Sequence, residues 1–328
     1  MRTPRLVVGI FSLGMMIFAA GVAFGQTTST SSGQAYPNKP IRIYAPQAGT
    51  SVDFVLRLVA SLATETLSQR IIVENRGIIG VEIVARAPPD GYSLINYTNP
   101  LWLMPLFRDN MSWDPVKDFS PISLTVRAPS VLVVHPSVPV RSVKALIALA
   151  KARPGELNYA STSTGNANHI AAELFKAMAG VNIVRVNYKG GAQANSDLVA
   201  GQVHLQFGSA GVVMPHVKSG RLRGLAVASA EPSALAPGLP TIAAAGLPGY
   251  ESTASTALLA PAKTPQAIIN RLNQEFVRVL NKAEVKERLF NAAIEVVASS
   301  PEALAAAIKS EMATIGKVVK DAGLREKG

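Results

Sequence analysis

The chain has 328 residues, of which 48% are hydrophobic and 16% are charged, and its formal net charge is +11. This length suggests about two domains, and the apolar content suits large cores and excludes a disordered chain. The sequence contains no cysteine and only four histidines, none of them in an H-x-x-H or H-E-x-x-H pair. These counts exclude a disulfide scaffold and a cysteine nucleophile, and they argue against a metalloenzyme. We expect no cofactor.

The N-terminal segment has the pattern of a secretory signal. Arg2 and Arg5 precede an uncharged, apolar run over residues 6–25 that ends in small side chains. A basic start, an apolar centre and a small-residue end are typical of a signal peptide. We expect cleavage after residue 25, leaving 26–35 as a flexible, Ser/Thr-rich lead-in and the mature chain in the periplasm. The alternative is an uncleaved anchor, because about 19 apolar residues can just span a bilayer.

Short β-rich runs then alternate with longer helical patterns. The hydrophobic periodicity predicts, in chain order, a strand over 41–45, a helix over 52–68, a strand over 71–73, a helix over 81–87 and a strand over 92–97. This βαβαβ order favours a parallel sheet covered by helices.

The alternation restarts after Pro129. The predicted elements are strands over 131–134, 157–161, 183–188, 203–207 and 222–228, with helices over 143–152, 167–178 and 192–199 between them. A Pro/Gly-rich stretch over 232–248 precedes a strand over 255–260, helices over 265–280 and 283–292, an edge strand over 294–298 and a terminal helix over 301–322.

Two α/β lobes follow from this order. We predict that lobe 1 comprises residues 36–127 and 251–328 and that lobe 2 comprises 128–250. The chain then crosses between the lobes twice, near 122–132 and near 250–260. Ligands of open α/β sheets bind at the carboxyl ends of strands, so a cleft between the lobes is the expected binding site.

Two strand-to-helix loops carry most of the candidate ligand-binding residues. The first provides Gly49, Thr50, Ser51 and Asp53, and the second provides Ser161, Ser163, Thr164, Gly165, Asn166 and His169. A helix N-terminus offers unpaired N–H groups and a positive dipole end, which can hold a carboxylate or phosphate. The alternative is that these hydroxyl and amide side chains only cap their helices. Asp53 could bind a ligand amine, position loop amides or complement the helix dipole.

Two further loops add Lys189, beside a Gly-Gly pair, and Ser209. Lys189 could attract an anion, whereas no phosphate-binding loop or G-x-S-x-G elbow occurs in the chain. Lys and Arg are scattered rather than clustered, which argues against nucleic-acid binding and favours a positive protein that gathers small anions. A secreted hydrolase using a serine and His169 is a remote alternative, because no partner spacing supports it.

Ordered segments over nearly the whole mature chain resemble the substrate-binding proteins of tripartite tricarboxylate transporters, also called Bug receptors. The segments that carry this resemblance are Tyr36–Arg42, Val73–Arg76, Pro89–Tyr92, Asp114–Phe119, Leu157–Ser161, Tyr188–Gly190, Pro215–Gly220 and Gly246–Glu251.

The resemblance implies a two-lobe periplasmic binding protein of the type II-like kind. Nothing in the sequence points to a catalytic nucleophile, so we expect no enzymatic activity, and a monomer is the default oligomeric state. It implies a small organic carboxylate as ligand and the membrane subunits of a tripartite tricarboxylate transporter, or occasionally a sensor, as partner. In this family the ligand carboxylate meets backbone amides and ordered water. That role falls here on the two candidate loops, from Gly49 to Asp53 and from Ser161 to His169.

The sequence departs from the family pattern at the expected pocket. The first loop is one residue short and has Val52 where a threonine is usual, and the loop over 74–80 is shortened. Gly208 stands where the family has an acid, and Ser255 and Thr256 replace a usual aromatic pair. Losing an acid would remove repulsion of an anion or a partner for an amine, and the smaller pair would enlarge the cavity or leave it to water. A neutral or aromatic ligand, or a sensor role, is therefore the alternative function.

Overall fold

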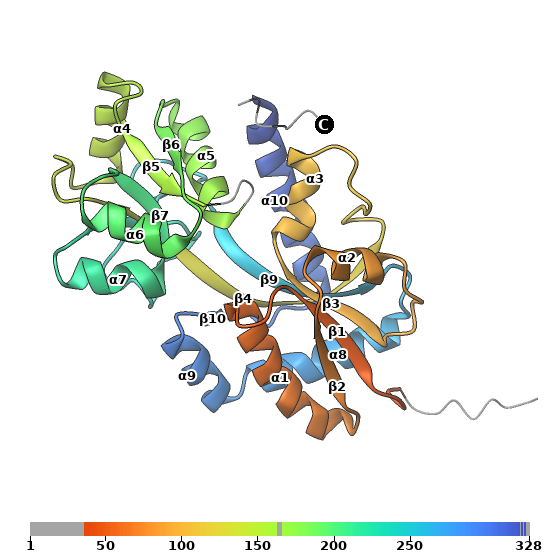
Figure 1. Cartoon of the computed structure of the whole chain (residues 1–328). Helices are drawn as coiled ribbons and strands as arrows, with labels where there is room; N and C mark the ends of the chain where they lie inside the picture. Colours follow the sequence, from red (N-terminus) through yellow and green to blue (C-terminus); the bar gives the residue numbers. More distant parts are fainter. Residues whose placement is uncertain (1–35, 163–165, 322, 324, 326–328) are drawn as a thin grey trace, which may run out of the picture. The chain divides into compact units, whose positions relative to one another are not determined.

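The computed structural model describes residues 36–162, 166–321, 323 and 325 (Figure 1). These described residues, from Tyr36 onward, belong to one compact unit. The predicted signal peptide and lead-in, and the candidate residues Ser163, Thr164 and Gly165, lie outside the described residues. Within the described part of the chain, no helix combines the length and the apolar character that a membrane crossing requires.

The N-terminal βαβαβ order forms the expected parallel sheet. Strand β1 (Ile41–Ala45) lies between β2 (Ile71–Asn75) and β3 (Ser93–Thr98) and runs parallel to both. Helices α1 (Ser51–Leu67) and α2 (Ile78–Ala85) connect these strands. The periodicity of α1 explains its place, because Val55, Val59 and Ala63 share one buried face.

Two long strands join the two parts of the sheet. Strand β4 (Phe119–Val134) pairs with β9 (Thr253–Pro261) as far as Pro129, and from Ser130 onward it pairs with β7 (Leu205–Ser209). Figure 1 shows β4 and β9 side by side between the green lobe and the rest of the described chain. The two crossover strands are thereby confirmed, whereas the lobe boundaries stay a prediction.

The second α/β part repeats the first. Strand β5 (Asn158–Ser161) lies between β6 (Val184–Asn187) and β7 and runs parallel to both, while β8 (Arg223–Val227) pairs antiparallel with β4. The strand order is β2-β1-β3-β9-β4-β7-β5-β6. The helices of this second part include α4 (Val143–Ala152), α5 (Ala167–Ala179) and α6 (Gly191–Val199).

C-terminal helices cover both faces of the crossover strands. Helix α8 (Gln266–Leu280) packs Ile269, Leu272 and Phe276 into one core, next to α9 (Ala283–Asn291). Helix α10 (Pro301–Asp321) buries Leu304 and Ile308 in a different core and contacts β4, α3 (Pro100–Phe107) and α5. Helix α10 therefore contacts elements of both predicted lobes, as well as the crossover strand β4.

The structure differs from the sequence predictions at four places. Helix α3 was not predicted, since it is apolar on all sides and contains Pro105. The loop expected around Ser209, over residues 207–211, is absent: β7 runs to Ser209, and α7 (Ala210–Lys218) starts at the next residue. Strand β4 begins at Phe119 instead of 131, and the edge strand β10 is only Glu295–Val296.

Candidate functional site

The loop after β1 is a tightly bonded structure at the start of α1. The Thr50 hydroxyl accepts a hydrogen bond from the Asp53 N–H at 3.3 Å and so caps the helix. Gly49 adopts a φ of +76°, which only glycine adopts without strain, and its N–H donates to Oδ2 of Asp53 at 3.1 Å. Ser51, the first helical residue, is exposed. The hydroxyl of Thr50 therefore serves as a cap, while Ser51 stays available to solvent.

Asp53 organises this loop from within the protein. Its side chain is buried and accepts hydrogen bonds from Nε of Arg57 at 3.0 Å and from Nδ2 of Asn75 at 2.8 Å. Burial by itself raises the pKa of Asp53, but the hydrogen bonds from Arg57, Asn75 and the Gly49 N–H, with the Arg57 charge, bring that pKa below its usual value. Of the three roles considered for Asp53, positioning the loop amides is the one that these contacts support.

The loop after β5 has a guanidinium group beside it. Ser161 is buried, and its Oγ accepts a hydrogen bond from Nε of Arg185 at 2.8 Å. Arg185 lies on β6 and also donates to the Thr162 carbonyl and to Oδ1 of Asn187. Positive charge therefore lies at the carboxyl ends of β5 and β6, close to the N-terminus of α5.

The start of α5 is capped by the predicted asparagine. Oδ1 of Asn166 accepts from the His169 N–H at 2.8 Å, and its Nδ2 donates to the Thr162 hydroxyl. His169 is buried one turn into the helix. These contacts support the capping interpretation of Asn166, and they place His169 inside the lobe rather than on its surface.

The two remaining predicted residues lie at strand ends and are exposed. Lys189 follows β6, and Ser209 ends β7 opposite Ser130 of β4. The residue before Ser209 must be small, because a Cβ on Gly208 would lie 2.2 Å from Cγ1 of Val213. This contact gives a physical reason for a glycine where the family pattern has an acid.

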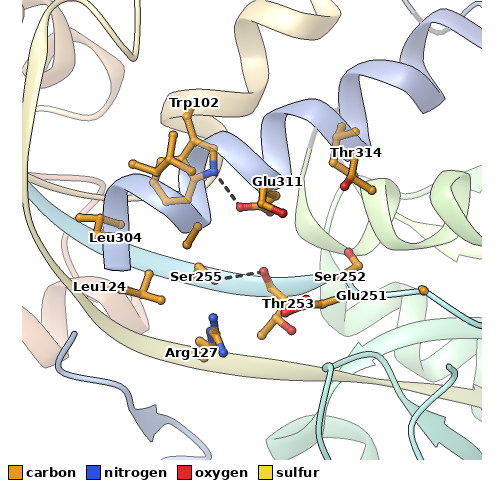
Figure 2. A pocket seen from close by; sticks show the side chains of 15 residues that line it. Trp102, Leu124, Arg127, Glu251, Ser252, Thr253, Ser255, Leu304, Glu311 and Thr314 are labelled. Carbon is orange, nitrogen blue, oxygen red and sulfur yellow. Dashed lines mark hydrogen bonds between the residues drawn. The ribbon is translucent and has the colours of Figure 1, made fainter. Parts of the chain in front are cut away.

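A cavity of about 350 Å³ lies against the crossover strands, covered by α3 and α10 (Figure 2). Arg127 enters it from β4, Ser255 and Thr253 from β9, and Glu311 from α10. Glu251, which precedes β9, completes its charged groups. Ser255 belongs to the wall, at the position where the family pattern places an aromatic side chain, so the cavity includes space that a larger residue would fill.

Glu311 is held in place by two N–H groups. Nε1 of Trp102 donates to its Oε2 at 2.8 Å, and Nδ2 of Asn99 donates to its Oε1 at 2.9 Å. Burial raises the pKa of Glu311 and the charge of Glu251 adds to the rise, while the two hydrogen bonds and Arg127 oppose it, leaving that pKa above its ordinary value. The cavity therefore contains one cation and two carboxyl groups.

A second, more open groove of about 420 Å³ lies along α1. Gly49, Thr50 and Asp53 line it together with Arg57, and Arg288 of α9 reaches it as well. Arg288 lies over the ring of Phe54, 5.6 Å from its centroid. The structure thus brings three predicted residues of the first loop together with two arginines.

Only one of these two cavities is lined by predicted ligand-binding residues. The groove along α1 contains first-loop residues, and neither lining includes Ser161 or Asn166. Sequence reasoning missed Arg127, Glu311 and Trp102. Arg127 did leave a signal, since it is a charge inside the otherwise uncharged run from 119 to 140. Among the described residues, no group of three His, Asp or Glu side chains could hold a metal ion.

Comparison with known proteins agrees with this architecture. The family described as "Tripartite tricarboxylate transporter family receptor" matches residues 55–324. Protein BugT of Bordetella pertussis is 31% identical over 334 residues, covering all of both chains. A protein from the tcbD-tcbE intergenic region of Pseudomonas sp. strain P51 is 35% identical over 309 residues, covering 92% of each chain.

Solved structures share the fold. Rpa4515 of R. palustris with adipate is 35% identical, with a TM-score of 0.72 over 88% of this chain and 98% of its own. MatC (Rpa3494) of Rhodopseudomonas palustris with bound malate is 27% identical, with a TM-score of 0.69 over 87% of this chain and all of its own. The expected two-lobe α/β binding-protein fold is confirmed. The chain belongs to the tripartite tricarboxylate transporter receptor family, whose members are periplasmic solute-binding proteins and not enzymes.

Proposed function

We propose that this protein, exported after signal cleavage and monomeric, captures a small organic carboxylate in the cleft between its lobes. The observation that carries the proposal is the relative with adipate, which is 35% identical over nearly its whole length. A second relative holds malate, so two dicarboxylates are bound by proteins of this fold. We further propose that the carboxylate is delivered to the membrane subunits of a tripartite tricarboxylate transporter.

The two candidate loops have the chemistry that a carboxylate requires. The N-termini of α1 and α5 present N–H groups and the positive ends of their dipoles. Arg185 adds a full positive charge beside Ser161, and Ser51 adds an exposed hydroxyl at the first loop. In this proposal Gly49 and Thr50 position the first loop, Lys189 and Ser209 line the rim, and Asp53 holds the loop amides in place.

Isothermal titration calorimetry with adipate, malate and citrate tests this function on the refolded mature chain. We expect at least one of these compounds to bind, and we expect Ser161→Ala to weaken binding at least tenfold, because a lost hydrogen bond to a charged group is worth about 1.5–3 kcal/mol. Ser51→Ala should weaken it by a smaller factor. Ser196→Ala, on the exposed face of α6, is the matched control and should leave binding unchanged. Folded protein that binds no carboxylate would contradict the proposal.

A further inference from the structure

The loop after β2 lies at the same sheet edge as the first candidate loop. Strands β1 and β2 are parallel neighbours and each is followed by a helix, so α1 and α2 both begin at the carboxyl edge of these strands. Two hydrogen bonds tie the loops together: Nδ2 of Asn75 donates to the Pro46 carbonyl at 3.0 Å, and the Gly77 N–H donates to the Ala45 carbonyl at 3.2 Å. The residues that open α2 therefore border the loop to which we assign the ligand carboxylate.

The first two residues of α2 are isoleucines in different surroundings. Ile78 packs against the hydrophobic core, whereas Ile79 is 60% exposed. The charged side chains of the preceding residues are engaged with one another, since Glu74 accepts from Arg42 at 2.9 Å and from Arg76 at 3.3 Å. Ile79 therefore adds an exposed apolar surface beside a loop that is otherwise polar.

We propose that Ile79 contacts the hydrocarbon part of the ligand, so that the protein favours a carboxylate with an apolar chain over a hydroxylated one. Burying a methylene against an apolar side chain is favourable, whereas burying a hydroxyl there without a hydrogen-bond partner is costly. The carboxylate itself stays with the N–H groups of the candidate loops. Adipate, which the 35% identical relative holds, has an unsubstituted hydrocarbon chain and belongs to this class. This inference names the chemical class of the ligand and rests on the proposed function.

Adipate and galactarate form a matched pair that tests this preference. Both are unbranched dicarboxylates of the same chain length, but galactarate carries a hydroxyl on each of its inner carbons. Calorimetry on the mature protein should show adipate binding at least about tenfold more tightly, because hydroxyls of galactarate would face Ile79. Equal or tighter binding of galactarate, or binding of malate or citrate without adipate, would overturn the inference and leave the proposed function standing. Failure of every one of these carboxylates to bind would overturn both.

Variants on α2 locate the contact. Ile79→Ser should weaken adipate binding at least about fourfold, the factor that one buried methylene contributes. It should also bring the affinities for adipate and galactarate closer together. Ile83→Ser is the matched control, because Ile83 is also exposed, at 38%, but lies one turn further along the helix from the loop. This control should change neither affinity.

Thermal denaturation of both variants, run in parallel, establishes that they are folded. Because both side chains are exposed, their replacement removes little core packing. A preference for adipate that survives Ile79→Ser unchanged, or that Ile83→Ser reduces to the same extent, would overturn the inference.

Discussion

The hydroxyl of Ser233 donates a hydrogen bond of 2.5 Å to Oε1 of Glu295. Ser233 lies between β8 and β9, in the predicted lobe 2, while Glu295 begins β10, which pairs with Val126 and Arg127 of β4. Close packing accompanies this bond, since a Cβ on Gly211 would lie 2.7 Å from Cβ of Ala293. Elements far apart in the chain are therefore fastened together beside the crossover strands.

Removing the Ser233 hydroxyl should loosen this connection. We expect Ser233→Ala to lower the free energy of unfolding by about 1 kcal/mol, because a partly buried hydrogen bond to a carboxylate is lost. Urea denaturation measures the change. Ser219→Ala, which removes an exposed hydroxyl from the end of α7, is the control. If both variants have the same stability, the Ser233–Glu295 bond does not contribute.

Gly208 should tolerate no side chain while Val213 is present. A Cβ there would lie 2.2 Å from Cγ1 of Val213, so Gly208→Ala should cost about 1–3 kcal/mol through overpacking. Adding Val213→Ala should recover part of that loss, which a double-mutant cycle in urea would reveal as coupling.

The control for this cycle is Gly191→Ala. Nothing lies within 4 Å of a Cβ at Gly191, the first residue of α6. We expect this substitution to be neutral or slightly stabilising. Additive effects of Gly208→Ala and Val213→Ala would contradict the contact.

Asp53 should link stability to acidic pH. The folded-state pKa of Asp53 is lowered, so its stabilisation is present above the unfolded value of about 3.9 and is lost as pH falls through the folded value. Asp53→Asn should cost about 2 kcal/mol near pH 7, since hydrogen bonds from Arg57 and Asn75 weaken. Urea denaturation from pH 7 to pH 3 should show that the difference in free energy of unfolding between the unsubstituted protein and Asp53→Asn becomes smaller at the acidic end. A gap that stays constant with pH would mean that the Asp53 charge is not what stabilises the loop.

Glu311 should act in the opposite sense. Its folded-state pKa is raised, so the folded protein holds the proton more tightly, and stability falls as pH rises from the unfolded value of about 4.3 through the folded value. The Glu311→Gln variant should lack this decline. Its free energy of unfolding should therefore rise relative to that of the unsubstituted protein as pH increases toward 7. Parallel denaturation curves from pH 4 to pH 7.5 measure it, with Glu302→Gln as the reference. The same downward slope in Glu311→Gln would assign the decline to another group.

Local sequence signals predicted most elements because their causes are local. Thr50, Ser142 and Asn166 cap the helices that the periodicity predicts, and α4 begins and ends where predicted. Strand β4 was predicted too short because Pro121 and Pro129 interrupt its strand pattern. In the structure, β9 nevertheless pairs along β4 as far as Pro129. Tertiary pairing decided the length of that strand.

The cavity could not be predicted from the sequence, because its residues meet only through the fold. Arg127 and Glu311 are 184 positions apart, and Trp102 comes from a helix that the pattern did not indicate. The two candidate loops after β1 and β5, in contrast, follow strands that the sequence placed to within one residue. Even there, the sequence did not predict Arg185 beside Ser161, because neighbouring strand ends meet only once register is known.

Crystallography of the mature protein with a bound carboxylate shows whether the two candidate loops hold the ligand. We expect ligand carboxylate oxygens within hydrogen-bond distance, directly or through one water molecule, of N–H groups from both the Gly49–Ser51 and the Ser161–Asn166 segments. A bound carboxylate that contacts neither segment, in a protein whose lobes are both ordered, would contradict it.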